Sequence, residues 1–321
     1  MEVYQSFSSF KSKKQTVVTI GMFDGVHLGH QKILSKVTAN AQEMDCESVV
    51  LTFFPHPKMV VHQNTNVQLL NTISERIHLI EKTQIDHLII QKFDLEFSNL
   101  SALDFVQNIL VKHLNVKKII IGYDHRFGKN RAANVDDLIA FGRVLNFEVE
   151  QISVQEIQDV AISSTKIRQA IMDGNISLAN HYLGYPYQLQ GTVIKGNQKG
   201  RTIGFPTANV QVAENYKMIP KNGVYIAHAR INHKMYNGVM NIGTRPTING
   251  VDLAIEIHLF DFDSDVYHQE IEVYLLQNLR DEIKFDHFEL LKNQIAIDKQ
   301  LAIDYFDKKA SKNSMEHHLE N

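Results

Sequence analysis

The stretch that decides the fold is Gly21-Met22-Phe23-Asp24-Gly25-Val26-His27-Leu28-Gly29-His30. It follows residues 17–20, which are all β-branched and mostly apolar and so predict a buried strand. It precedes residues 31–42, where apolar side chains recur at helical spacing. The stretch is therefore a strand-to-helix turn. Its three glycines permit a sharp turn, and the free N–H groups and positive dipole end of the new helix suit an anion such as phosphate.

His27 and His30 stand about one helical turn apart, so both rings can face the same anion. The plain alternative is a glycine-rich turn that carries two surface histidines. The stretch lacks the glycine spacing of a P-loop and of the dinucleotide fingerprint. A zinc site would need a third ligand, which the sequence does not single out. The stretch alone leaves a phosphate site and a plain turn open.

The rest of the first half alternates apolar runs with helical patterns. Such runs, separated by helices, predict a parallel sheet covered on both faces, with ligands beyond the carboxyl ends of the strands. Ser74 is expected to cap its helix. The predicted strands are residues 48–53, 86–91, 117–122 and 147–152, and the predicted helices are residues 74–83, 101–114 and 134–145.

Three polar motifs follow these elements. His56 lies between two prolines that should fix an extended turn. Residues 122–128 place Asp124 and Arg126 in a glycine-bounded loop. Residues 163–168, Ser-Ser-Thr-Lys-Ile-Arg, begin a helix where hydroxyls and cations could clamp phosphate. Taken singly, the three motifs also fit a rigid loop, a surface ion pair and a helix cap.

The pattern changes near residues 184–187, where short alternating strands and frequent turns begin and predict a small antiparallel barrel. Its predicted strands are residues 188–195, 223–231, 235–241, 253–260 and 270–276, followed by a helix over residues 288–306. Residues 196–209 contain three glycines that could wrap phosphates. Within them, Thr207 and Asn209 offer hard oxygens that suit magnesium bound to ATP. A hairpin loop entering a strand is the alternative.

Composition sets the class of protein. A chain of 321 residues suffices for two domains, and 44% hydrophobic with 21% charged residues is ordinary for a globular protein. A net charge of −3 gives no reason to expect nucleic acid or membrane as a partner. The one cysteine, Cys46, fits a reducing compartment. No segment approaches the roughly 18 apolar residues of a membrane span, so a cytoplasmic protein is expected. The oligomeric state stays open.

Taken together, the motifs resemble the bacterial bifunctional riboflavin kinase/FAD synthetase family from residue 17 to residue 305. Residues 21–30 are similar to the His-x-Gly-His signature of nucleotidylyltransferases, and the three polar motifs follow in the family's order. The second half resembles riboflavin kinase at residues 206–209 (Pro-Thr-Ala-Asn), 223–225, 241–247, 256–262 and 279–285. His125 departs from the phenylalanine common in the family, and His268 departs from its usual glycine.

The resemblance implies a Rossmann-like α/β FMN adenylyltransferase domain over residues 1–185. It further implies a β-barrel riboflavin kinase domain with a closing helix over residues 186–310, and a disordered tail over residues 311–321. The kinase would phosphorylate riboflavin to FMN with ATP. The adenylyltransferase would join AMP from a second ATP to FMN, giving FAD and pyrophosphate. Mg²⁺ would accompany ATP.

The resemblance also implies a set of site residues. Glu256 would be the catalytic base of the kinase, and His27 and His30 would act on the phosphates in adenylyl transfer. The adenylyltransferase would bind ATP and FMN through Gly21, Phe23, Asp24, Gly25, His56, Asp124, Ser163, Ser164, Thr165 and Arg168. The kinase would bind ATP through Gly196, Lys199, Gly200, Arg201, Gly204 and Pro206, flavin through Arg280, Glu282 and Phe285, and the metal through Thr207 and Asn209.

Two other functions are compatible with parts of the pattern. One is a different cytidylyl- or adenylyltransferase joined to an unrelated barrel, against which the barrel motifs argue. The other is a flavin-binding or regulatory protein without activity. Intact His27, His30, Asn209 and Glu256 favour the enzyme.

Overall fold

The computed structural model describes residues 1–61, 67–122, 125–153, 162–196, 200, 204–247 and 250–319. The chain forms two compact units, the first of Met1–Ser164 with Tyr216–Met218 and the second of Thr165–Asn215 with Ile219–Asn321. This boundary lies upstream of residue 185, where the sequence pattern changes. The reason is that α8 (Ile176–Leu183) packs on the barrel strands β7 (Tyr187–Ile194) and β12 (Glu270–Asp281), where Asn180 Nδ2 donates to Leu275 O at 2.8 Å.

The first unit is built on a six-stranded sheet in the order β1-β4-β3-β2-β5-β6, and all neighbouring strands are parallel. The predicted parallel sheet is therefore confirmed. The sequence analysis missed the edge strand β1, because three residues are too short for a visible pattern. The strands are β1 (Glu2–Tyr4), β2 (Thr16–Ile20), β3 (Glu47–Phe54), β4 (His87–Lys92), β5 (Val116–Gly122) and β6 (Glu148–Ile152).

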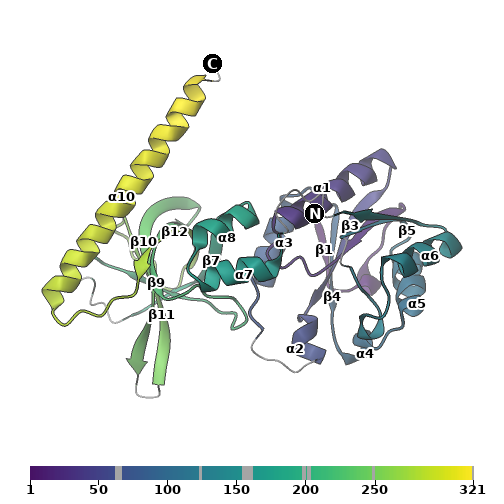
Figure 1. Ribbon diagram of the computed structural model, residues 1–321, viewed down its shortest axis with the longest axis horizontal. Helices are drawn as coiled ribbons and strands as arrows, with labels where there is room; N and C mark the ends of the chain where they lie inside the picture. Colours follow the sequence, from purple (N-terminus) through teal and green to yellow (C-terminus); the bar gives the residue numbers. More distant parts are fainter. Residues whose placement is uncertain are drawn as a thin grey trace. The chain divides into compact units, whose positions relative to one another are not determined.

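Helices cover both faces of this sheet (Figure 1). On one face, Val18 and Leu51 share a hydrophobic core with Phe105 and Leu138. These two come from the π-helical η2 (Phe105–His113) and from α6 (Val135–Leu145). Because strand side chains alternate, the other face is left to α1 (Leu28–Glu43), which packs on β2, β3 and β5. Shorter elements complete the unit: η1 (Phe7–Ser9), α2 (Pro57–Val61), α3 (Ile73–Glu81), α4 (Leu95–Ser98), α5 (Ala102–Asp104) and η3 (Lys129–Arg131).

Two local predictions were wrong. The N-cap of α3 is Thr72 rather than Ser74, because Thr72 and Glu75 form a reciprocal capping box. The segment after His56 is not an extended turn through both prolines, because Pro57 is the first residue of α2. Proline is well suited to that position, where its missing N–H costs no helical hydrogen bond.

The second unit is a closed barrel with strand order β10-β11-β8-β7-β12-β9, and every pairing is antiparallel. The predicted barrel is confirmed. β8 was not predicted, and β10 and β12 run further than expected because their partners continue beside them. The strands are β7 (Tyr187–Ile194), β8 (Ala208–Gln211), β9 (Gly223–Ile231), β10 (Lys234–Thr247), β11 (Gly250–Leu259) and β12 (Glu270–Asp281).

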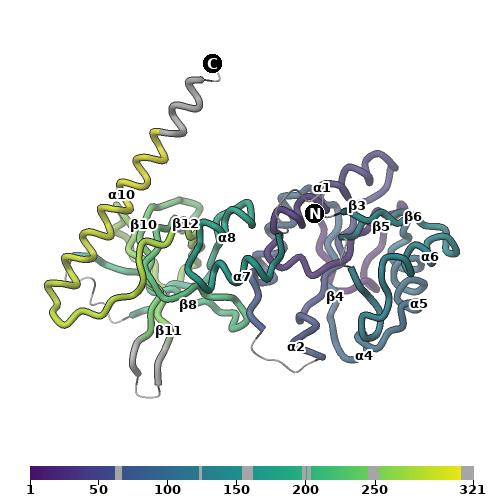
Figure 2. Tube along the Cα trace, in the orientation of Figure 1, coloured from purple at the N-terminus to yellow at the C-terminus, as the bar shows by residue number. Residues whose placement is uncertain are grey.

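Helices precede and follow the barrel strands in the sequence. α7 (Ser164–Met172) and α8 precede β7 in sequence. The closing helix α10 (Phe288–Leu319) begins in the yellow-green part of the trace in Figure 2, and its buried Ala302 packs against Ile226 and Phe260 of the barrel. The helix thus continues past residue 306 into residues 311–319, for which the sequence predicts a disordered tail.

Candidate active sites

The Gly21–His30 stretch forms the turn between β2 and α1. His27 is the N-cap of α1, and its Nδ1 accepts the N–H of His30 at 3.4 Å. Gly25 has a φ of 90°, which glycine adopts without steric cost. The backbone therefore turns sharply between β2 and the 16-residue helix α1, whose first N–H groups lack the helical partners of later turns.

The two histidine rings are stacked on each other. Their centroids lie 3.7 Å apart with 17° between the planes, and Phe23 meets His30 edge-on at 5.1 Å. Burial lowers the pKa of His30 well below 6.5, and His27 and Arg76 lower it further. His30 is therefore mainly neutral at pH 7 in the free protein.

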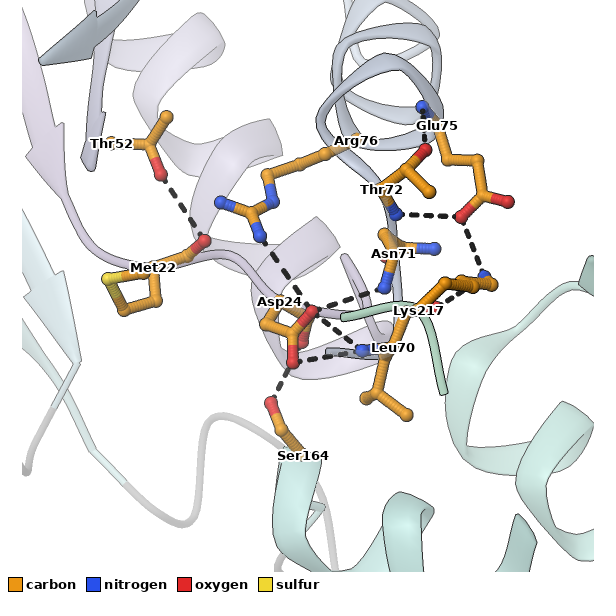
Figure 3. Close-up of polar contacts among 10 residues, drawn as sticks. All are labelled: Met22, Asp24, Thr52, Leu70, Asn71, Thr72, Glu75, Arg76, Ser164 and Lys217. Carbon is orange, nitrogen blue, oxygen red and sulfur yellow. Dashed lines mark hydrogen bonds and ion pairs between the residues drawn. The ribbon is translucent and has the colours of Figure 1, made fainter. Parts of the chain in front are cut away.

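Asp24 is fixed within this turn by contacts to both its side chain and its main chain (Figure 3). Its buried carboxylate accepts the N–H of Leu70 at 3.0 Å and of Asn71 at 3.2 Å, and lies 3.8 Å from Arg76 Nη2. Its carbonyl accepts the hydroxyl of Ser164 at 2.8 Å. Ser164 and Asp24, both predicted from the sequence, are thus brought together. Arg76 was missed, because nothing in a helical pattern shows that a buried arginine faces a distant aspartate.

The other predicted adenylyltransferase residues are more scattered. His56 is half-buried, and its Nδ1 accepts the N–H of Lys58 at 3.1 Å. Ser163 belongs to the first unit, whereas Thr165 and Arg168 lie on α7 in the second. In the segment after β5, Asp124 lies outside the described residues, and the centroid of the His125 ring is 6.1 Å from that of Phe127, with 23° between the planes.

A second polar cluster lies in the barrel around Glu256. The carboxylate stands on β11 opposite Asn209 of β8, and Thr207 Oγ1 donates to Glu256 Oε2 at 3.2 Å. Gly196 leaves room for Asn209, because a Cβ on Gly196 would lie 2.2 Å from Asn209 Nδ2. The structure therefore gathers the predicted base and the two predicted metal ligands at one place.

Gly200 and Gly204 lie at positions that favour glycine. A Cβ on Gly200 would lie 2.3 Å from the carbonyl oxygen of Phe205, and Gly204 has a φ of 85°. Lys199 and Arg201, predicted to bind ATP, lie outside the described residues. His268, at the family's usual glycine, has a φ of 65°, the left-handed region that favours glycine.

His258 is a functional candidate that the sequence analysis missed. Its Nδ1 lies 2.8 Å from the carbonyl oxygen of Pro206, which can only accept, so Nδ1 carries the proton. Burial lowers the pKa of His258 and favours this neutral form. A usable signal was present: His258 follows Glu256 by two residues, and side chains two apart share one face of a strand.

Arg280, predicted to bind flavin, is held by α10. Its Nε and Nη2 donate to Asp298 at 3.0 and 2.7 Å, and Asp298 is only 3% exposed. Glu282 accepts from Asn222 Nδ2 at 3.1 Å, and Phe285 is half-buried. Nothing in the sequence singles out Asp298, because one aspartate on an amphipathic helix usually faces solvent.

Comparison with known proteins covers both units. The FAD synthetase family matches residues 9–166, and the riboflavin kinase family matches residues 183–306. A bifunctional riboflavin kinase/FMN adenylyltransferase of Haemophilus influenzae is 40% identical over 90% of this chain and 94% of its own length. The chain belongs to this bifunctional family. It is therefore both a riboflavin kinase, which yields FMN, and an FMN adenylyltransferase, which yields FAD.

Other members of the bifunctional family are similar over nearly the same length. The Bacillus subtilis protein is 38% identical over 92% of this chain and 94% of its own. The Escherichia coli K12 protein is 36% identical over 90% and 92%. Both carry the same two activities in their names.

A solved structure shares the fold of the whole chain. It is a Streptococcus pneumoniae crystal structure described as a macrolide-efflux protein, with a TM-score of 0.85 and 31% identity over 94% of this chain and 98% of that one. In the part of this chain that the structure describes, none of the helices has the length and apolar character to cross a membrane. The family assignment rests on the two family matches and the bifunctional relatives.

Proposed function

We propose that each activity of the bifunctional enzyme belongs to one polar cluster: FMN formation to the barrel cluster of Thr207, Asn209 and Glu256, and FAD formation to the turn of residues 21–30. The observation that carries the proposal is the contact of Thr207 with Glu256 opposite Asn209, which joins a carboxylate to two neutral oxygen ligands. Each cluster has its own set of partners, so each reaction can be tested separately.

In the kinase reaction, Glu256 accepts the proton of the riboflavin 5′ hydroxyl as that oxygen attacks the γ-phosphorus of ATP. The bond to the bridging oxygen of ADP breaks, and FMN forms. Gly196, Gly200 and Gly204 bind the ATP phosphates, and Gly200 lies close to the carbonyl oxygen of Phe205. Arg280, Glu282 and Phe285 bind the flavin.

Magnesium fits this barrel cluster. Hydroxyl and amide oxygens are ligands that Mg²⁺ accepts, with ATP phosphates and water supplying the others. Thr207 Oγ1 and the side-chain oxygen of Asn209 would hold the ion beside Glu256. When bound, it neutralises charge on the transferring phosphoryl group. His258 contributes by fixing the Pro206 carbonyl, which orients the segment that carries Thr207.

In the adenylyl transfer, a phosphate oxygen of FMN attacks the α-phosphorus of ATP, and the bond to pyrophosphate breaks. The amino end of α1 and the rings of His27 and His30 face this charge. Neutral in the free site, His30 still offers an N–H donor, and the approach of the anionic triphosphate raises its pKa toward the charged form. Hydrogen bonds and positive charge placed in advance stabilise the transition state.

The test is a flavin chromatogram from three full-length proteins incubated with riboflavin and Mg-ATP. Wild type should produce FMN and then FAD. Glu256→Gln should produce neither unless FMN is added, and then FAD should appear at the wild-type rate. The double change His27→Asn with His30→Asn should accumulate FMN and stop there. Normal FMN formation by Glu256→Gln, or normal FAD formation by the histidine variant, would refute the corresponding assignment.

A further inference from the structure

Lys217 comes from a distant part of the sequence, the connection between β8 and β9, and yet belongs to the first compact unit. Its main chain forms a parallel bridge with Leu69. Leu69 N–H donates to Tyr216 O at 2.7 Å, and Met218 N–H donates to Leu69 O at 2.8 Å. The first unit is therefore completed by three residues that lie within the barrel's part of the sequence.

The Lys217 ammonium is wholly buried and makes two short contacts (Figure 3). Nζ donates to Glu75 Oε2 and to the carbonyl oxygen of Leu70, both at 2.6 Å, and the side chains of Lys217 and Glu75 are 0% exposed. Burial lowers the pKa of Lys217, and the carboxylates of Glu75 and Asp24 oppose that shift. A buried cation is costly without such partners, so this geometry requires both partners to keep their places.

The two partners of Lys217 lie at the start of α3: Leu70 precedes the helix, and Glu75 is in its first turn. Glu75 Oε2 also accepts the N–H of Thr72 at 2.9 Å, and Thr72 Oγ1 accepts the N–H of Glu75 at 3.2 Å. Lys217 therefore bonds to the carbonyl just before this capping box and to the carboxylate inside it. The main chain of residues 70–75 is fixed at two points by one side chain.

The same segment also contacts Asp24, in the turn of residues 21–30. The N–H groups of Leu70 and Asn71 donate to the Asp24 carboxylate, and Arg76 lies 3.8 Å from it. One peptide group carries both contacts: the Leu70 carbonyl accepts from Lys217 Nζ, and the Asn71 N–H donates to Asp24. Asp24, Glu75, Arg76 and Lys217 are each at most 3% exposed, and their two positive and two negative charges balance.

We infer that Lys217 is a positioning residue for adenylyl transfer: it fixes the Leu70–Asn71 main chain, which fixes Asp24, and thereby the turn that carries His27 and His30. The inference rests on the proposed function of residues 21–30. Loss of the ammonium would release the Leu70 carbonyl and leave one more buried negative charge than positive beside a site for an anionic substrate. Displacement of reacting groups by about 1 Å can cost roughly 10²-fold in rate.

The experiment uses the full-length enzyme with Lys217→Met, which keeps the length and apolar stem of the side chain. FAD formation from FMN and Mg-ATP should lose about 10- to 100-fold in kcat, while FMN formation from riboflavin stays within about twofold. Rates are measured at saturating ATP and well below the thermal midpoint of each variant. Lys221→Met is the matched control, because Lys221 lies in the same connection but pairs with Asp281, outside the first unit. It should leave FAD formation unchanged.

A double variant, Lys217→Met with Glu75→Gln, separates positioning from folding. It removes both members of the buried ion pair, so the thermal midpoint should recover toward wild type. It does not restore the bond to the Leu70 carbonyl, so kcat for FAD formation should stay low. Recovery of the midpoint and kcat together would overturn the inference, as would normal FAD formation by Lys217→Met. If neither variant folds, Lys217 is a folding residue and the inference is likewise wrong.

The double variant His27→Asn with His30→Asn distinguishes a failure of the Lys217 inference from a failure of the proposed function. If the change of His27 and His30 to Asn abolishes FAD formation while Lys217→Met leaves it normal, only the role of Lys217 fails. If the histidine variant still makes FAD, the assignment of the site itself fails.

Discussion

Asp298→Ala should destabilise the barrel unit and weaken riboflavin binding. Asp298 lies on α10, is 3% exposed, and accepts from Arg280 through Nε at 3.0 Å and Nη2 at 2.7 Å. Gln294, one turn earlier, also donates to it at 2.9 Å. Alanine at this position removes the partner and leaves the arginine charge in the interface between β12 and α10.

The size of the effect follows from burial. Removing one partner of a buried ion pair costs about 3–5 kcal/mol, because the other charge stays desolvated. The Arg280 side chain is 19% exposed, so water relieves part of that cost, and about 2–3 kcal/mol is expected. For a unit of this size, each kcal/mol lowers the thermal midpoint by about 2–4 °C. The expected shift is therefore about 4–12 °C.

Asp304→Ala is a matched control on the same helix. Asp304 is exposed and accepts from Gln300, again one turn earlier and at 2.9 Å. A pair of this kind on a helix surface contributes about 0.2–0.5 kcal/mol, so its loss should shift the midpoint by no more than about 2 °C.

Calorimetry of the full-length protein measures both variants, and the shift for Asp298→Ala should fall in the transition of the barrel unit. The KM for riboflavin should rise in that variant, while FAD formation from added FMN stays normal. Equal midpoints for Asp298→Ala and Asp304→Ala would show that the Arg280 pair does not hold α10 to the barrel.

Three further predictions concern the two active sites and the boundary between them. Glu256→Gln should slow FMN formation at least about 100-fold in a riboflavin assay without weakening ATP binding, as expected for a lost general base. Burial holds the pKa of His30 in the folded protein below 6.5, so the unfolded chain takes up a proton first as the pH falls. The free energy of unfolding should therefore decrease as the pH drops below 6.5. His30→Asn should remove up to about 1.4 kcal/mol of this decrease per pH unit, measured by denaturant titration. A fragment beginning at Thr165 should make FMN and no FAD. Its thermal midpoint should be higher than that of a fragment beginning at Tyr185, because only the longer fragment keeps α8 on the barrel. Equal thermal midpoints would contradict this reason.

Much of the fold could be predicted from the sequence because the signals for it lie in residues close together in the chain. The apolar runs that became β2 to β6 have the length and composition of buried parallel strands, and the glycines of residues 21–30 lie at the turn itself. Thr72 and Glu75 also stand three apart in the sequence, so their capping box could have been predicted from the spacing alone. Short elements such as β1 and β8 were missed because three or four residues define no period.

The sequence by itself determined the two-part organisation, the glycine turn with its paired histidines, and the Pro-Thr-Ala-Asn segment, because each depends on residues close together in the chain. Only the tertiary structure decided the partners of the buried charges. Asp24 meets Arg76, Glu75 meets Lys217, and Arg280 meets Asp298 only in the folded chain, and no period or spacing encodes which charges will share a desolvated site. Tertiary structure also decided the charge state of His30, because the desolvation that lowers its pKa exists only in the packed protein.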